Sequence, residues 1–146
     1  MKEKNIYAAA LRMRNAIEFN RKGLAEAGYR LFEFFPEGCC EYTTLFLGNY
    51  LISEGLCDAD RITFPQNNYD PTGTESHTWL ILDDYLIVDI TADQYSEVNE
   101  KVIVTDYSKF HSQFEGEKIV SFSVLYKHWS QGNEAERFDK AWKILK

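Results

Sequence analysis

Long apolar runs are missing from this sequence. No window approaches the roughly 20 apolar residues that a helix needs to cross a bilayer. The first residues, MKEKN, also lack the apolar core of a secretion signal. We therefore expect a cytoplasmic protein with no membrane partner.

Dense clusters of basic residues are missing as well. The chain has 16 Lys and Arg residues against 23 Asp and Glu residues, which gives a net charge of −7. A protein that binds the phosphate backbone of a nucleic acid needs positive charge gathered on one surface. The charge balance therefore argues against a nucleic-acid partner.

Cysteines are few. The chain has 3 of them, an odd number, among 146 residues. Because 45% of the residues are hydrophobic and 15% aromatic, the chain can build a core without disulfide bonds. We expect reduced thiols and a single domain that spans residues 1–146.

Helical periodicity is present at the start, in the middle and at the end of the chain. Residues 6–24 carry apolar side chains at i, i+3, i+4 and i+7 positions, which predicts an amphipathic helix ending near Gly28. Residues 41–54 are apolar on nearly every side up to Gly55, as expected of a helix buried at the centre of a fold. Residues 134–145 have one apolar stripe and predict a terminal helix.

Other segments have the composition or the alternation of strands. They are residues 61–64, 76–82, 85–91, 102–105 and 119–126. The second and third are separated only by Asp83-Asp84 and predict a β-hairpin. The order of helices and strands predicts an α+β fold, in which helices are segregated from a mostly antiparallel sheet.

Two adjacent cysteines, Cys39 and Cys40, lie at the predicted start of the buried helix. A helix N-terminus stabilises a thiolate, and a nearby imidazole held by a carboxylate completes a nucleophilic site. The hairpin offers both partners, because His77 heads its first strand and Asp89 lies near the end of its second. We therefore predict a triad of cysteine, His77 and Asp89. The polar residues 65–76, which lead to His77, are expected to border its cleft.

The triad sets a condition on the hairpin, because a register shift of one residue moves a side chain to the other face of a sheet. A two-residue turn at Asp83-Asp84 would pair His77 with Ile90 and send Asp89 to the opposite face. We therefore predict either a loop of odd length or a β-bulge. A three-residue loop over residues 82–84 would pair His77 directly with Asp89.

The segments GCCEYTTLFLGNYLISEGL and SHTWLILDDYLIVDITADQY resemble the core of the transglutaminase-like cysteine enzymes, relatives of the papain-fold proteases. In that superfamily a cysteine opens a buried helix, an H-x-W strand follows, and D-x-T lies on the next strand. The pattern H-x-W-L…D-x-T-A-D-Q is similar to a bacterial branch, to which processing-protein domains of lasso-peptide systems look related. The resemblance covers residues 36–95 and implies a papain/transglutaminase-like core with flanking N- and C-terminal helices.

The resemblance implies which cysteine reacts. The family's nucleophile is commonly followed by a small residue four positions on and by a glycine several turns later, and counting from Cys40 gives Thr44 and Gly55. Counting from Cys39 misplaces the glycine by one residue, so Cys39 is the second choice and is otherwise a small apolar filler. The implied activity is hydrolysis or acyl transfer at an amide bond of a peptide, a protein or a small amide, with no cofactor.

The implied roles follow the chemistry of a thiol triad. Cys40 attacks the carbonyl carbon, His77 acts first as base and then as acid, and Asp89 orients His77. The backbone N–H of Cys40 is the first donor to the oxyanion.

A second oxyanion donor is harder to assign. Papain relatives place it, often as a Gln, shortly before the cysteine, but residues 30–39 contain no Gln or Asn. Gln94, Gln66, Asn67 and Asn68 are the alternatives. The missing donor also keeps open a non-catalytic binding or scaffold module with the same fold.

Metal binding is not expected. A zinc site made of Cys39, Cys40, Cys57 and His77 would need two adjacent cysteines on one ion, without the short C-x2-C chelate of structural zinc sites. The remaining histidines, His111 and His128, lie in no motif and are interpreted as ordinary surface or core residues.

Overall fold

The structure is a computed structural model that describes residues 2–66, 76–114 and 118–146. Its helices are α1 (Lys2–Glu26), α2 (Cys40–Ser53), α3 (Lys109–Ser112), α4 (Phe122–Ser130) and α5 (Ala135–Leu145). Its strands are β1 (Ile62–Gln66), β2 (Leu80–Leu82), β3 (Leu86–Asp89), β4 (Ile103–Thr105) and β5 (Lys118–Ser121). Short 3-10 turns lie between them at η1 (Arg30–Phe34), η2 (Ala59–Arg61), η3 (Ala92–Gln94) and η4 (Gly132–Glu134). The predicted α+β class is confirmed.

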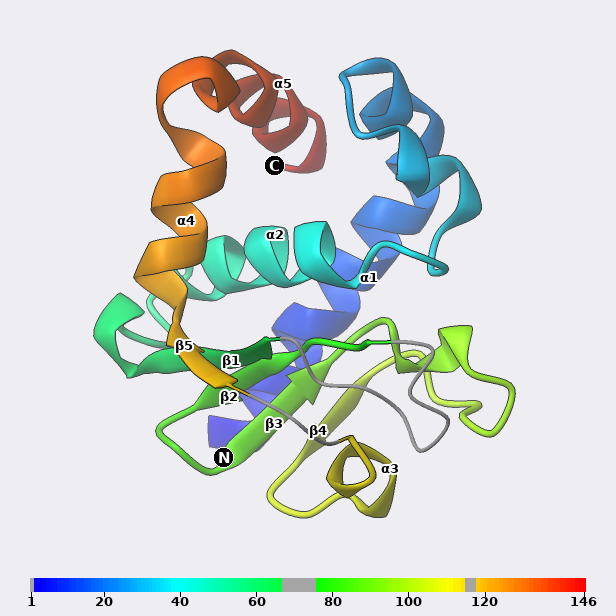
Figure 1. The fold of residues 1–146 in the computed structure, drawn as a ribbon, viewed down its shortest axis with the longest axis vertical. Helices are drawn as coiled ribbons and strands as arrows, with labels where there is room; N and C mark the ends of the chain where they lie inside the picture. The colour runs from blue at the N-terminus through cyan, green and yellow to red at the C-terminus, as the bar shows by residue number, and fades with distance from the viewer. Residues whose placement is uncertain (1, 67–75, 115–117) are drawn as a thin grey trace.

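The strands form one antiparallel sheet in the order β4-β3-β2-β1-β5. In Figure 1 the sheet lies at the bottom of the view and α2 runs above it, while α4 rises from β5 past α2 and leads to α5, which lies on the side of α2 away from the sheet. Both α1 and α4 pack against α2. The start of α2 is thereby brought to the strand ends that carry the candidate site residues. Among the described residues, no helix is both long enough and apolar enough to span a membrane.

The long helices follow their predicted patterns. The helix α1 buries the expected stripe, including Ile6, Met13 and Ile17, although it begins earlier than predicted, at Lys2. The helix α2 begins at Cys40 and ends just before Gly55, whose positive φ of 70° lets the chain turn away. Its buried residues lie on several sides, as a central helix requires. The terminal helix α5 buries its apolar stripe as predicted.

The hairpin between β2 and β3 has the predicted odd loop. Leu82 pairs with Leu86, which leaves Asp83, Asp84 and Tyr85 outside the ladder. Asp83 and Asp84 have positive φ values of 52° and 66°, a conformation that Asp tolerates better than most residues and that type I′ hairpin turns need. The loop therefore lies one residue later than the predicted loop over residues 82–84.

Two strand predictions were wrong in extent. The strand predicted at residues 76–82 includes only Leu80–Leu82, so His77 precedes the ladder instead of belonging to it. The strand predicted at residues 119–126 ends at Ser121, and α4 begins at Phe122. Phe122 and Leu125 are three residues apart and both buried, which a helix allows on one face and a strand would place on opposite faces.

Candidate active site

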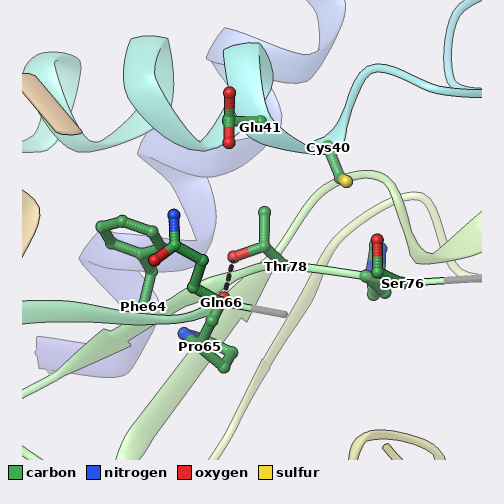
Figure 2. A pocket seen from close by; sticks show the side chains of 8 residues that line it. Cys40, Glu41, Phe64, Pro65, Gln66, Ser76 and Thr78 are labelled. Carbon is green, nitrogen blue, oxygen red and sulfur yellow. Dashed lines mark hydrogen bonds between the residues drawn. The ribbon is translucent and has the colours of Figure 1, made fainter. Parts of the chain in front are cut away.

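Cys40 is the first residue of α2 and is only partly buried. It lines a cavity of about 150 Å³ together with Glu41, Phe64, Pro65, Gln66, Ser76, His77 and Thr78. Figure 2 shows its sulfur pointing from the helix start toward the segment that carries Ser76 and Thr78. This segment is held to β1 by a 2.5 Å hydrogen bond from Thr78 Oγ1 to the carbonyl oxygen of Pro65. The Cys40 thiol therefore faces a cavity whose opposite wall is held in place by this hydrogen bond.

Cys39 has the opposite environment. It is fully buried, and its Sγ donates to the carbonyl oxygens of Leu31 at 3.2 Å and Glu37 at 3.3 Å. Burial, with a smaller contribution from the neighbouring Cys40, raises the pKa of Cys39 to about 12. A buried thiol with a raised pKa is a poor nucleophile. These contacts favour Cys40 over Cys39.

His77 is 1% exposed and lies near both predicted partners. Its Nε2 lies 2.7 Å from Asp89 Oδ2, and Cys40 lines the same cavity as the ring. Because Nε2 is engaged by Asp89, Nδ1 is the nitrogen left for the thiol. Burial alone would lower the pKa of His77, but the charge and the hydrogen bond of Asp89, with smaller contributions from Cys40, outweigh it and raise the pKa to about 10.

Asp89 ends β3 and is 2% exposed. Its Oδ1 accepts hydrogen bonds from the backbone N of Thr91 at 2.9 Å and from Thr91 Oγ1 at 3.3 Å. Burial would raise the pKa of Asp89, but the charge of His77 and the hydrogen bonds from both neighbouring histidines hold it well below its ordinary value. The carboxylate is therefore ionised and held in one orientation.

The second histidine on this carboxylate is His111 of α3. Its Nε2 lies 2.7 Å from Asp89 Oδ2, the same oxygen that His77 uses, and its side chain is buried. Its Nδ1 lies 2.5 Å from Ser108 Oγ, and the backbone N of His111 donates to the same Oγ. No motif predicts this contact. The only local signal is the serine at the N-cap of α3, three residues before the histidine.

Aromatic rings enclose His77. Trp79, Tyr95, Phe110 and Phe114 have ring centroids between 5.3 and 6.1 Å from that of the imidazole. These side chains come from the segment before β2, from the turn after β3 and from the region of α3. They keep water from the His77 and Asp89 contact, which strengthens the electrostatic interaction between them.

The two glutamines lie on different sides of the imidazole and the thiol. Gln94 Nε2 donates to the carbonyl oxygen of Thr91 at 3.1 Å and lies 3.3 Å from His77 Nδ1. Gln66, at the end of β1, lines the Cys40 cavity, and Figure 2 shows its side chain rising toward the first turn of α2. The alternatives Asn67 and Asn68 lie outside the described residues.

The cluster of His77, Asp89 and His111 also has the donor types of a metal site, with ligand atoms within 4.8 Å of one another. Both Nε2 to Oδ2 distances are 2.7 Å, however, which are hydrogen-bond distances. An ion about 2 Å from each ligand would replace the protons of both contacts. The geometry as it stands is that of a hydrogen-bonded cluster, and the possible metal-ligand group among the described residues contains no cysteine.

No protein-family model, no curated protein and no solved structure matches this chain. The resemblance of residues 36–95 to transglutaminase-like enzymes therefore stays a prediction. What the fold and the site define is an α+β protein with a thiol at a helix start and a buried imidazole and carboxylate beside it.

Proposed function

We propose that this protein is a thiol-dependent amide hydrolase or acyltransferase with a papain/transglutaminase-like core. The observation that carries the proposal is that Cys40 and His77 line one cavity, while His77 is hydrogen-bonded to the buried Asp89. A thiol, a base and an orienting carboxylate are the minimum for nucleophilic catalysis at a carbonyl. The substrate is a peptide, a protein or a small amide, and the reaction needs no cofactor.

The reaction proceeds in two halves. The Cys40 thiolate attacks the carbonyl carbon, and the C–N bond breaks as the His77 imidazolium gives its proton to the leaving amine. This step leaves a thioester on Cys40. Water or a second amine then attacks the thioester, and His77 accepts the proton of the attacking group. The C–S bond breaks, which regenerates the Cys40 thiolate and releases an acid if water attacked or a new amide if an amine attacked.

The oxyanion needs donors near the helix start. The N–H groups in the first turn of an α-helix have no partner inside the helix, and that of Cys40 is the first of them. Gln66 is the better candidate for the second donor, because it lines the cavity and the Gln94 amide nitrogen already donates to Thr91. Gln94 then serves to position the imidazole.

One observation favours a non-catalytic binding or scaffold module instead. The Gln94 amide nitrogen lies 3.3 Å from the imidazole nitrogen that has to exchange a proton with Cys40. A donor at that position competes with the thiol for Nδ1. A module that kept the fold without turnover would tolerate this competition.

Alkylation of the intact protein separates the two functions. Iodoacetamide should label Cys40 faster than Cys39 and Cys57, and His77→Ala should slow the labelling by about 100-fold or more. Peptide mapping by mass spectrometry gives the labelled residue, and circular dichroism checks that each variant folds.

The matched control is Lys127→Ala, which removes an exposed side chain of α4 that lines neither the Cys40 cavity nor the hollow beside it. This variant should be labelled at the wild-type rate. Three thiols that react slowly and at similar rates, with no effect of His77→Ala, would favour the binding module and end the enzymatic proposal.

A further inference from the structure

We propose that the hollow beside the Cys40 cavity binds a large apolar side chain of the substrate. This hollow, the β5–α4 cavity, has a volume of about 230 Å³ and is lined by Glu41, Phe64, Gln66, Val120, Val124, Leu125, His128 and Trp129. The inference rests on the proposed function and deepens it, because it names the class of acyl group that Cys40 would receive.

Continuity with the Cys40 cavity is the first argument. Glu41, Phe64 and Gln66 line both hollows, so one wall runs from the thiol to the β5–α4 cavity. An acyl group bonded to Cys40 would have its carbonyl at the helix start. The side chain next to that carbonyl could then reach the β5–α4 cavity past Glu41 and Gln66.

Most of the residues that line the β5–α4 cavity are apolar, and several of them are held by packing. Phe64 and Leu125 are buried core residues, so this wall belongs to the packed interior. Trp129 packs edge-on against Tyr42 at a centroid distance of 5.1 Å, and His128 lies 4.6 Å from Trp129 in the same arrangement. Because these rings are already fixed by packing, a ligand that contacts them loses little conformational entropy of the protein on binding.

Exposed apolar surface at the rim is the second argument. Val124 is 57% exposed although it lies beside buried residues of α4, so the protein's own core does not cover it. A single exposed valine is ordinary, but this one lines a hollow that opens beside a candidate nucleophile. An aliphatic or aromatic side chain would cover it and lose its own hydration.

The charge of Glu41, which lines both cavities, narrows the class of substrate that the β5–α4 cavity would accept. Glu41 stands between the two hollows, and no basic side chain of the described residues makes an ion pair with it. A carboxylate there repels an acidic side chain. The preferred acyl donor is therefore a peptide with Leu, Phe or a similar residue at the attacked carbonyl, and the disfavoured donor has Asp or Glu there.

The test compares two electrophiles on the full chain, N-acetyl-leucine chloromethyl ketone and N-acetyl-glycine chloromethyl ketone. Each rate of Cys40 labelling is divided by the rate of the same probe with glutathione, which removes the difference in intrinsic reactivity. The leucine probe should then be about tenfold or more faster than the glycine probe.

Two variants of α4 locate the effect. Val124→Asp should bring the ratio of the two corrected rates close to one, because it places a charge in the apolar wall. Ser123→Asp adds the same charge at the neighbouring exposed position, which does not line the cavity, and should keep the wild-type ratio.

The outcomes separate the two proposals. If iodoacetamide labels Cys40 quickly and in a His77-dependent way while the corrected ratio is near one, the apolar subsite is overturned and the proposed function stands. The subsite is also overturned if Ser123→Asp abolishes the ratio as fully as Val124→Asp does. If Cys40 reacts slowly with every probe, the proposed function fails and the subsite fails with it.

Discussion

Asp89 is the central residue of the candidate site, because its carboxylate is almost fully buried and yet ionised. Four hydrogen bonds reach its two oxygens, from His77, His111, the Thr91 backbone and the Thr91 hydroxyl. A buried carboxylate with fewer donors would take up a proton instead. His111 therefore acts as a positioning residue: it supports the charge of Asp89 even when His77 has given its own proton away.

Replacing His111 tests that role. His111→Phe keeps a ring against Trp79 and Phe110 but removes the hydrogen bond to Asp89. Because this hydrogen bond lowers the pKa of Asp89, its loss should raise that pKa toward the ordinary value. A hydrogen bond to a charged group contributes enough to move the midpoint by about one pH unit.

The readout is the pH profile of Cys40 alkylation. Protonating Asp89 removes the charge that supports the His77 imidazolium, so the acid side of the profile should move to higher pH in His111→Phe. Ser108→Ala, which removes the partner of His111 Nδ1 and the N-cap acceptor of α3 but keeps the imidazole, should shift it the same way by less. A slower rate with an unmoved acid midpoint would mean that His111 is only a packing residue.

Helices and strands were predicted correctly where the sequence pattern fits only one type of secondary structure. The stripes of α1 and α5 and the apolar run of α2 each fit a helix, and the need to put His77 and Asp89 on one face led to the odd hairpin loop. The run IVSFSVLY fits both a strand and a helix, and tertiary packing decides between them: Phe122 fills the space beside Gly48 of α2. The contact of His111 with Asp89 depends on the same kind of long-range packing, so no local pattern could reveal it.

The contact of α2 with α4 can be tested by filling that space. A Cβ at residue 48 would lie 2.3 Å from Phe122 Cε1, so Gly48→Ala requires the buried ring to move. Alanine favours a helix over glycine by about 1 kcal/mol, whereas overpacking a core costs about 1–3 kcal/mol. The free energy of unfolding should therefore fall by about 1 kcal/mol or more in urea denaturation.

Gly23→Ala in α1 is the matched control. Its Cβ would meet only Ile144, at 3.8 Å, which is ordinary van der Waals contact. This variant should be more stable than the wild type by up to about 1 kcal/mol. Equal stabilisation by both substitutions would show that α4 does not pack on Gly48 as described.

At the scale of the whole molecule, distant segments converge on the residues around Asp89. Arg14 of α1 is buried and donates to both carboxylate oxygens of Asp93, at 2.7 and 2.9 Å, and to the carbonyl oxygen of Ile90 at 2.8 Å. The N-terminal helix thus fixes the turn between Asp89 and Gln94. The candidate site therefore depends on contacts between distant parts of the chain, so its ionisation should contribute to the free energy of unfolding of the protein.

The pH dependence of the free energy of unfolding measures this contribution of the candidate site. The pKa of His77 is raised from 6.5 to about 10, so the folded protein binds this proton more tightly than the unfolded chain does. The stabilisation is therefore complete below pH 6.5 and is lost as the pH rises toward 10. The pKa of Asp89 is lowered from 3.8, so its stabilisation is present above that pH and is lost as the pH falls below it.

Urea denaturation of the wild type and of Asp89→Asn at pH 5, 7 and 9 gives the comparison. The wild type should exceed the variant by the largest margin at about pH 5, because both groups are then charged in the folded state, and the margin should shrink by about 1 kcal/mol or more by pH 9. The variant has no charge opposite His77, so it lacks this dependence. A margin that is constant from pH 5 to 9 would mean that His77 and Asp89 do not form an ion pair in the folded protein, and would remove the electrostatic basis of the proposed triad.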